Sequence, residues 1–314
     1  MKIKDQLKNT LKSYKKITSV DSYSGKVRDN YDLGDKLLMV TTDRVSAFDC
    51  VLGTIPFKGE ILTQVAKFWF DKTKHIVPNH IIDYPDPQVI LTKKAKVFPI
   101  EMIVRQFITG SLWREYSSGI NGQYGFMMPD GLKENQKLDS IILTPSTKEE
   151  YGKHDQPISR EKIIDGIISE ETYSKLETYS LELFKEGQKW ADSRGLILVD
   201  TKYEFGIVDG EIIVVDEIHT PDSSRYWVAD GYEKRFKNNE KQLMLDKENI
   251  RQWLIDRGFK GQGTPPKLSD EIRVSLSESY IKLYQKITGN DFKGEVADVT
   301  ERISRNLVDS GFDF

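Results

Sequence analysis

The chain has 314 residues, of which 46 are Lys or Arg and 49 are Asp or Glu, so its formal net charge is −3. This balance argues against a general nucleic-acid binder, because such proteins normally carry a basic field. The 38% of hydrophobic and 11% of aromatic residues exclude disorder over the whole chain. The length predicts about two domains or one large domain with two lobes.

The apolar runs of the sequence are too short to span a membrane. Residues 196–199 form one of the longest, far below the roughly 20 residues that a spanning helix needs. No apolar stretch of the kind found in signal peptides follows the lysine-rich residues 1–16. Cys50 is the only cysteine, which excludes an intrachain disulfide and a cysteine-cluster zinc site. We therefore expect a cytoplasmic monomer or small homo-oligomer with no membrane and no nucleic-acid partner.

The first hundred residues are predicted to be mostly strands joined by short turns. Two extended runs around Gly34 predict a β-hairpin over residues 26–42. Residues 81–97 form a second extended region, and 101–105 is a further strand candidate.

Longer elements are predicted in the second half of the chain. Apolar residues at 3-, 4- and 7-residue spacings predict helices over 170–194 and 269–288, each followed by a glycine that can end it. Between them, the extended residues 196–208 and 211–217 flank Asp209-Gly210, which is the strongest hairpin signal in the chain.

This order of elements favours an α+β fold in two lobes with a cleft between them. We expect the boundary between the lobes near residue 100, which divides the chain into residues 1–100, mostly strands, and residues 101–314, which end in helices. From residue 231 onward the sequence offers no motif that indicates a role beyond packing.

The predicted hairpin at 196–217 carries acids at a high density. Because alternate residues of a strand share a face, Asp200, Lys202 and Glu204 lie on one side, and Asp216 follows on the returning strand. Carboxylates suit Mg²⁺, and a lysine beside them suits phosphate or carboxylate oxygens. A solvated outer face of an antiparallel hairpin explains the same pattern equally well.

The length of the turn at Asp209-Gly210 decides which acids meet. A two-residue loop places Glu204 opposite Val215, so that Asp216 faces away and Glu217 becomes the better ligand. A three-residue loop or a bulge places Glu204 directly opposite Asp216. The sequence leaves both registers open.

Two further segments suit phosphate groups. Gly25 opens the first hairpin, with Lys26 and Arg28 on one strand face, although a plain β-turn explains the glycine as well. Arg105 leaves an apolar strand shortly before Ser111, a natural N-cap for a helix over 112–117, and the start of a helix binds phosphate well.

Two other short patterns stand near these segments. Ser146 and Glu149 have the spacing of a capping box, which predicts a helix start there. Residues 219–225 follow the acidic strand at once and are rich in hydroxyl and charged side chains.

Together these segments resemble one family, phosphoribosylaminoimidazole-succinocarboxamide synthase, or SAICAR synthetase, of purine biosynthesis. The resemblance spans roughly residues 20 to 230 and rests on segments in this order: 25–29, 42–49, 109–111, 144–148, 200–206, Asp216-Glu217 and 220–225. It implies a small antiparallel lobe like that of protein kinases above a larger ATP-grasp-like lobe. It also implies a reaction in which ATP, carboxyaminoimidazole ribonucleotide and L-aspartate give SAICAR, ADP and phosphate through an acyl phosphate.

The resemblance also implies roles for individual residues. Lys202, Glu204 and Asp216 would be catalytic, with Glu204 and Asp216 holding Mg²⁺. The other expected contacts fall into three groups: for ATP, Gly25, Lys26, Val27, Arg28, Glu101 and Ile103; for the ribonucleotide, Arg105, Ser111, Asp222 and Arg225; for the imidazole or the aspartate, Asp43, Ser46, Asp49 and Lys148.

Two other functions compete with this prediction. A kinase-like phosphotransferase would need a catalytic Asp after His-Arg and an Asp-Phe-Gly tripeptide, and the sequence contains neither. A nucleotide-binding protein without activity would not need Arg105 and Arg225 as a second anion site beside the acids.

Overall fold

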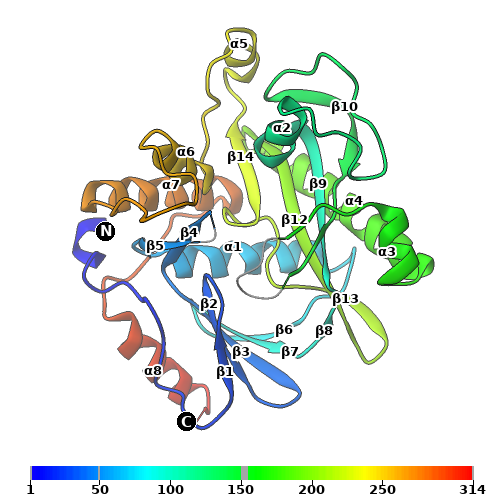
Figure 1. Cartoon of the computed structure of the whole chain (residues 1–314). Helices are drawn as coiled ribbons and strands as arrows, with labels where there is room; N and C mark the ends of the chain where they lie inside the picture. Colours follow the sequence, from blue (N-terminus) through cyan, green and yellow to red (C-terminus); the bar gives the residue numbers. More distant parts are fainter. Residues whose placement is uncertain (1, 49, 150–154, 313–314) are drawn as a thin grey trace.

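The structure is a computed structural model in which residues 2–48, 50–149 and 155–312 are described. Within these ranges the strands form two main antiparallel sheets, and helices lie between and around them (Figure 1). The predicted α+β class is confirmed. None of the described helices has the length and apolar character required to cross a membrane.

The smaller sheet contains the first predicted hairpin. Its strand order is β1-β2-β3-β7-β6. The bounds are Ser22–Ser24 for β1, Arg28–Asp32 for β2, Lys36–Thr41 for β3, Ile81–Asp86 for β6 and Val89–Lys93 for β7. The hairpin around Gly34 and the extended region after residue 81 are therefore confirmed.

The larger sheet is built around one long strand, β12. It pairs with four other strands, and the sheet order is β10-β9-β12-β13, with β11 on β9 and with β8 and β14 on β12. The bounds are Lys96–Val97 for β8, Ile100–Ile108 for β9, Gln136–Leu143 for β10, Ser146–Thr147 for β11, Leu196–Val208 for β12, Glu211–Val215 for β13 and Ser224–Val228 for β14. A separate hairpin consists of β4 (Arg44–Ala47) and β5 (Cys50–Thr54).

The helices cover these sheets from several sides. In chain order they are η1 (Ile3–Gln6), α1 (Lys58–Thr73), α2 (Gly110–Ser117), α3 (Arg160–Gly166), α4 (Glu170–Ser193), α5 (Tyr232–Lys237), α6 (Glu248–Ile255), α7 (Asp270–Thr288) and α8 (Val299–Asp309). Helices α4 and α7 confirm the two helices predicted from periodicity. The largest apolar core joins α1, α4 and α7 to β9 and β12.

Helix α1 is the main element that the sequence did not predict, because the first hundred residues were expected to be mostly strands. Its apolar stripe is present in the sequence, because buried apolar residues recur at helical spacing over 61–70 while residues 64, 67, 68, 71 and 72 are partly or fully exposed. What the sequence lacks is a local signal for the start of the helix. Its N-cap position holds Phe57 with φ of 63°, and no side chain there caps the helix. Instead, the distant Asp43 carboxylate accepts the N–H of Gly59 at 2.9 Å.

The chain ends return to the smaller sheet. Leu11, Tyr14 and Ile17 pack with Val299 and Ile303 of α8 against β2, β3 and β7. Thus the last helix belongs with the first strands, while α1 belongs with the core of the larger sheet. The division of the chain at residue 100 stays a prediction.

Two predicted helix starts are wrong. Helix α2 begins at Gly110 with Thr109 at its N-cap position, so Ser111 lies within the helix and does not cap it. Ser146 lies in the short strand β11, where its hydroxyl donates to Glu101 at 3.3 Å, and so it does not form a capping box with Glu149. In both cases the serine hydroxyl bonds to a charged side chain on β9, which a local pattern does not reveal.

Arg302 of α8 joins the C-terminal helix to the smaller sheet through buried charges. Its guanidinium donates to both carboxylate oxygens of Asp86 at 3.1 Å and to Gln88 at 2.8 Å, and Arg302 is only 6% exposed.

Removal of the Arg302 guanidinium leaves the Asp86 carboxylate without its cation. We expect Arg302→Met to lower the free energy of unfolding by about 3–5 kcal/mol in urea titrations.

The matched control is Arg305→Met, an exposed position on the same helix. It should change the unfolding free energy by less than about 0.5 kcal/mol. Equal effects of the two substitutions would contradict the role given to Arg302.

Candidate active site

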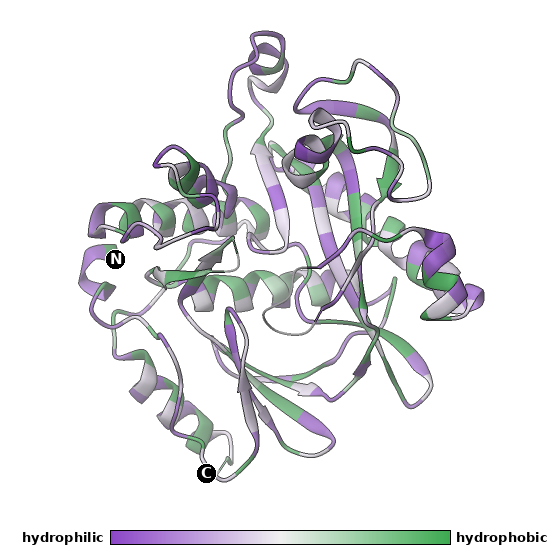
Figure 2. Ribbon diagram, in the orientation of Figure 1, coloured by the Kyte–Doolittle hydropathy of each residue, from purple (hydrophilic) through white to green (hydrophobic). Residues whose placement is uncertain are grey.

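The charged face of β12 is buried, not solvated. Asp200 is 6% exposed and Glu204 4%, whereas Val199, Tyr203 and Phe205 on the opposite face lie in apolar cores. The predicted alternation is confirmed, and the interpretation as a solvated outer face is wrong. Figure 2 shows hydrophilic segments interrupting β9, β12 and β14 in the middle of the sheet. Buried charges of this kind require partners.

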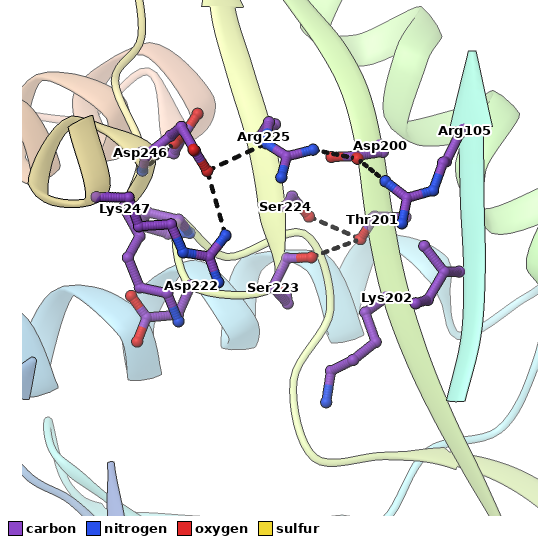
Figure 3. Close-up of a pocket in the computed structure, with 14 residues that line it drawn as sticks. Arg105, Asp200, Thr201, Lys202, Asp222, Ser223, Ser224, Arg225, Asp246 and Lys247 are labelled. Carbon is purple, nitrogen blue, oxygen red and sulfur yellow. Dashed lines mark hydrogen bonds and ion pairs between the residues drawn. The ribbon is translucent and has the colours of Figure 1, made fainter. Parts of the chain in front are cut away.

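One carboxylate of this face holds two arginines together. Asp200 Oδ2 lies 2.7 Å from Arg105 Nη1 and 2.5 Å from Arg225 Nη1 (Figure 3). The remaining nitrogens of Arg105 donate to Thr144 at 2.8 Å and to Ser111 at 3.1 Å. The two guanidinium groups therefore stand side by side in fixed orientations, as required for bidentate binding of an oxyanion.

The backbone at Gly110 makes room for this arrangement. A Cβ atom there would lie 2.2 Å from Arg225 Nη2, and the φ angle of +60° also favours glycine. The glycine before Ser111 is thus required by the close approach of Arg225 to the start of α2.

The arginines line a cavity of about 190 Å³. Its wall includes residues on β9, β12 and β14 and in the loop before β14, as expected. It also includes four residues on or just before α6 that the sequence analysis missed, namely Asp246, Lys247, Glu248 and Arg251. Lys247 and Arg251 are four residues apart, so they lie on one face of a helical turn. No sequence motif indicates that this face would pack beside β12.

Glu204 stands at the other end of the charged face, in a group that we call the lysine–glutamate cluster: Glu101, Lys148, Lys202 and Glu204. Lys202 Nζ lies 2.5 Å from Glu204 and 2.8 Å from Glu101, and Lys148 pairs with the second oxygen of Glu204. Burial alone would lower the pKa of Lys202, but Glu204, Glu101 and Asp216 outweigh it and raise that pKa well above its usual value. Lys202 is therefore a permanent cation at neutral pH.

The register of the hairpin is now fixed. Val208 pairs with Glu211 and Glu204 with Val215, as in a two-residue loop, so the three-residue alternative is wrong. Nevertheless Asp216 does not face away. It follows the end of β13 with φ of 63°, which breaks the alternation, and its charge acts on Lys148 and Lys202.

Arg28 of β2 connects the smaller sheet to this region. Its two terminal nitrogens pair with Asp216 at 2.6 Å and with Glu217 at 2.9 Å. The preceding turn is held by Arg44, which donates to the carbonyl oxygens of Gly25 at 2.9 Å and Lys26 at 3.2 Å. The loop predicted to bind phosphate thus lies against the acids after β13.

Comparisons with known proteins agree on one family. A family model described as SAICAR synthetase matches residues 21–268. The chain is 48% identical over 292 residues to the phosphoribosylaminoimidazole-succinocarboxamide synthase of Bacteroides thetaiotaomicron, with 91% of this chain and 93% of that protein covered. The chain belongs to the SAICAR synthetase family. The protein of the same name from Legionella pneumophila is 47% identical over 295 residues, with 91% and 94% covered.

Solved structures of SAICAR synthetases share the fold. The SAICAR synthase of Saccharomyces cerevisiae, in complex with SAICAR, superposes with a TM-score of 0.79 at 32% identity and covers 91% of this chain and 100% of its own. A SAICAR synthetase in complex with ADP gives a TM-score of 0.66 at 26% identity, with 87% and 100% covered. The family joins aspartate to carboxyaminoimidazole ribonucleotide in purine biosynthesis, so the expected reaction and ligase class are confirmed, whereas the acyl phosphate stays a prediction.

The donor set of the site fits Mg²⁺ in the form that accompanies nucleotides. Within the described residues no group of three or more His, Cys, Asp or Glu side chains is placed to hold a metal ion. Mg²⁺ usually needs only one or two carboxylates when phosphates supply further oxygens. Glu204 and Asp216 provide such carboxylates, and the cations Lys148, Lys202 and Arg28 now occupy them.

The structure places the other expected site residues as follows. Ile103 lines the cavity and Glu101 belongs to the lysine–glutamate cluster, so both lie beside the charged face of β12. Asp43 is fully buried, and its carboxylate accepts the N–H groups of Leu11 and Gly59, so its observed contacts stabilise the fold. Ser46 is buried in β4. Asp49 lies outside the described residues, and the roles of all these residues stay predictions.

A buried histidine packs on the apolar side of β12, opposite the charged face. His219 is fully buried, its ring packs 4.6 Å from that of Trp69, and its Nε2 lies 2.9 Å from the Tyr203 hydroxyl. Burial lowers the pKa of His219 to about 3. The ring is therefore neutral throughout the physiological range and acts as a packing element, not as an acid.

This depressed pKa makes the stability of the fold depend on pH. In the unfolded chain His219 binds a proton below about pH 6.5, whereas in the folded chain it stays neutral to about pH 3. The unfolded state binds more protons in this window, so stability falls as the pH drops. We expect His219 to contribute a loss of about 2 kcal/mol between pH 6.5 and 5.

The measurement compares urea unfolding of the wild type and His219→Asn at both pH values, because Asn tolerates the left-handed backbone at this position. The wild type should lose about 2 kcal/mol more than the variant on acidification. The same loss in both proteins would show that His219 is not buried in neutral form.

Proposed function

We propose that this chain makes SAICAR from ATP, carboxyaminoimidazole ribonucleotide and L-aspartate through an acyl phosphate on the imidazole carboxylate. The observation that carries this proposal is the charged face of β12, which joins the paired arginines at Asp200 to the lysine–glutamate cluster at Glu204. The two ends lie four residues apart, which is roughly 13 Å along a strand. One ribonucleotide can therefore lie along β12 with its phosphate at one end and its carboxylate at the other.

The ribonucleotide phosphate belongs in the cavity with the arginines. Arg105 and Arg225 offer two guanidinium groups, and the Ser111 hydroxyl at the start of α2 adds a neutral donor. Burial alone would lower the pKa of Arg225, but Asp200 and Glu248 outweigh it and raise that pKa above its usual value. Arg225 thus remains charged although it is buried. Lys247 and Arg251 extend the positive wall toward α6.

The triphosphate belongs between the smaller sheet and the lysine–glutamate cluster. Gly25, Lys26 and Val27 form the turn that Arg44 holds just before Arg28, and Arg28 reaches across to the acids. We propose that this sheet covers ATP and that Glu204 and Asp216 take up Mg²⁺ when ATP binds. The ion would offset charge on the phosphate oxygens. In that state Lys148 and Lys202 become free to pair with phosphate or carboxylate oxygens.

The first step requires that the substrates are positioned and that positive charge neutralises the phosphate oxygens. It requires no protein base. A carboxylate oxygen of the ribonucleotide attacks the γ-phosphorus of ATP and ADP leaves, which forms an acyl phosphate. Lys202, held as a cation by its neighbours, stabilises negative charge on the transferred group. The amine of L-aspartate next attacks the acyl carbon, inorganic phosphate leaves, and the amide forms with loss of a proton.

The proposal extends to further residues. Ser46, Asp49 and Asp222 are candidate contacts for the imidazole, the ribose or the aspartate, and Glu101 and Ile103 are candidate contacts near the nucleotide. The cytoplasmic location also stays a prediction. The family assignment does not favour a kinase-like phosphotransferase acting on another phosphorylated metabolite.

The test is the release of ADP with each substrate omitted in turn. We expect ADP and SAICAR to form in equal amounts when ATP, Mg²⁺, the ribonucleotide and L-aspartate are all present. Omission of the ribonucleotide should abolish ADP release, because no phosphoryl acceptor remains. ADP release that needs aspartate but not the ribonucleotide would contradict the proposed order of bonds.

Removal of the Glu204 charge should abolish turnover and leave the fold intact. Glu204→Gln keeps the shape of the side chain but removes the charge that holds Lys148 and Lys202. We expect kcat to fall by about 10²-fold or more in the SAICAR assay. The matched control is Glu211→Gln on the exposed end of the same hairpin, which should retain full activity. A Glu204→Gln variant with normal kcat would exclude the proposed catalytic role.

Arg105 should affect the two nucleotides differently. Arg105→Ala removes one of the two guanidinium groups at Asp200 but touches nothing in the turn around Gly25. We expect the KM for the ribonucleotide to rise by about tenfold or more, and the KM for ATP to change less than threefold. Arg160→Ala, which removes an exposed arginine paired with Glu170, is the control. Equal increases in both KM values would remove Arg105 from the ribonucleotide site.

A further inference from the structure

The turn that follows β13, residues 216–224, is organised around one buried hydroxyl. Thr220 is fully buried, and its Oγ1 donates to Glu217 Oε2 at 2.6 Å. The same oxygen accepts the backbone N–H groups of Asp222 at 3.3 Å and Ser223 at 3.2 Å. The Thr220 N–H in turn donates to Ser223 Oγ at 3.1 Å. The hydroxyl thus uses its donor and both of its acceptor positions within the turn.

One end of the 216–224 turn meets the loop proposed to cover the triphosphate. Glu217, which accepts the Thr220 hydroxyl, also pairs with Arg28 at 2.9 Å. Because Glu217 is only 8% exposed, this pair is shielded from water and restricts where Arg28 can lie. The position of the Arg28 side chain therefore depends on how Glu217 is held.

The other end meets the ribonucleotide cavity and the catalytic lysine. Asp222, Ser223 and Ser224 line the cavity. The Ser223 carbonyl accepts the backbone N–H of Lys202 at 3.0 Å. A shift of the turn would thus move the cavity wall and the strand segment that carries Lys202 together.

We propose that Thr220 is a positioning residue for the ligation, since its hydroxyl fixes the triphosphate loop, through Glu217 and Arg28, and the ribonucleotide cavity, through Ser223, in one relative placement. This inference rests on the proposed function of the two sites. Thr220 is fully buried and is not among the residues that line the cavity. It acts through the geometry of the groups on either side, and small displacements of such groups reduce reaction rates strongly.

Thr220→Val tests the hydroxyl with little change in side-chain volume. It removes one donor from the Glu217 carboxylate, which still pairs with Arg28, and it removes the acceptor of the Asp222 and Ser223 N–H groups. We expect kcat/KM for the ribonucleotide to fall at least tenfold, with a lower kcat and a higher KM together. Thr220→Ser restores the hydroxyl and should bring kcat/KM back to within threefold of the wild type.

A matched control separates positioning from a general loss of stability. Thr73→Val in α1 removes another fully buried threonine hydroxyl, which donates only to the Trp69 carbonyl at 2.6 Å. Its kcat/KM should stay within twofold of the wild type, although its thermal unfolding midpoint falls. Should Thr220→Val fail to fold, Glu217→Gln removes the charge that pairs with Arg28 and should lower kcat/KM for the ribonucleotide in the same way.

Three results would overturn the inference. Wild-type kinetics in Thr220→Val would show that the hydroxyl does not position the site. Equal defects in Thr220→Val and Thr220→Ser, or unchanged kinetics in Glu217→Gln, would lead to the same conclusion. A wild-type protein that forms no SAICAR would instead remove the proposed function itself, so the two failures are distinguishable.

Discussion

The site depends on the need to neutralise a row of buried charges on β12. Asp200 and Glu204 are almost completely buried, and an unpaired carboxylate in that position would be strongly destabilising. Each therefore holds two cations, Arg105 and Arg225 at one end and Lys148 and Lys202 at the other. The cations that compensate the strand are also the groups that an anionic substrate needs. Under the proposed function, stability and substrate binding use the same charges, and a bound phosphate shares cations that already pair with the strand.

The fold keeps this row in register with the triphosphate loop. Helix α1 packs in the core beneath β9 and β12, and its first turn is held by Asp43, which also fixes Leu11 in the N-terminal segment. The last helix, α8, closes the smaller sheet through Arg302 and Asp86. The described segments near both ends of the chain are therefore packed against the smaller sheet. Arg28 provides the direct connection, because it leaves the smaller sheet and pairs with acids after β13.

The sequence predicted what depends on local periodicity. Alternation along 200–204 placed three charged residues on one face, and helical spacing found α4 and α7. The failures have both local and long-range causes. Helix α1 carries an apolar stripe over residues 61–70, but no local side chain caps its start, which is held by the distant Asp43. The backbone of Asp216 leaves the strand conformation, so alternation misplaces its side chain. Lys247 and Arg251 reach the cavity only through the docking of α6, which no local pattern describes.

The central claim is that the charged face of β12 brings the ribonucleotide carboxylate to the γ-phosphate of ATP. The most direct measurement uses a ribonucleotide whose carboxylate carries ¹⁸O, turned over with unlabelled ATP and L-aspartate. If the carboxylate attacks phosphorus, one labelled oxygen must appear in the inorganic phosphate released, and mass spectrometry of that phosphate should show one ¹⁸O for each SAICAR formed. Phosphate that contains no label, formed while SAICAR accumulates, would contradict the account.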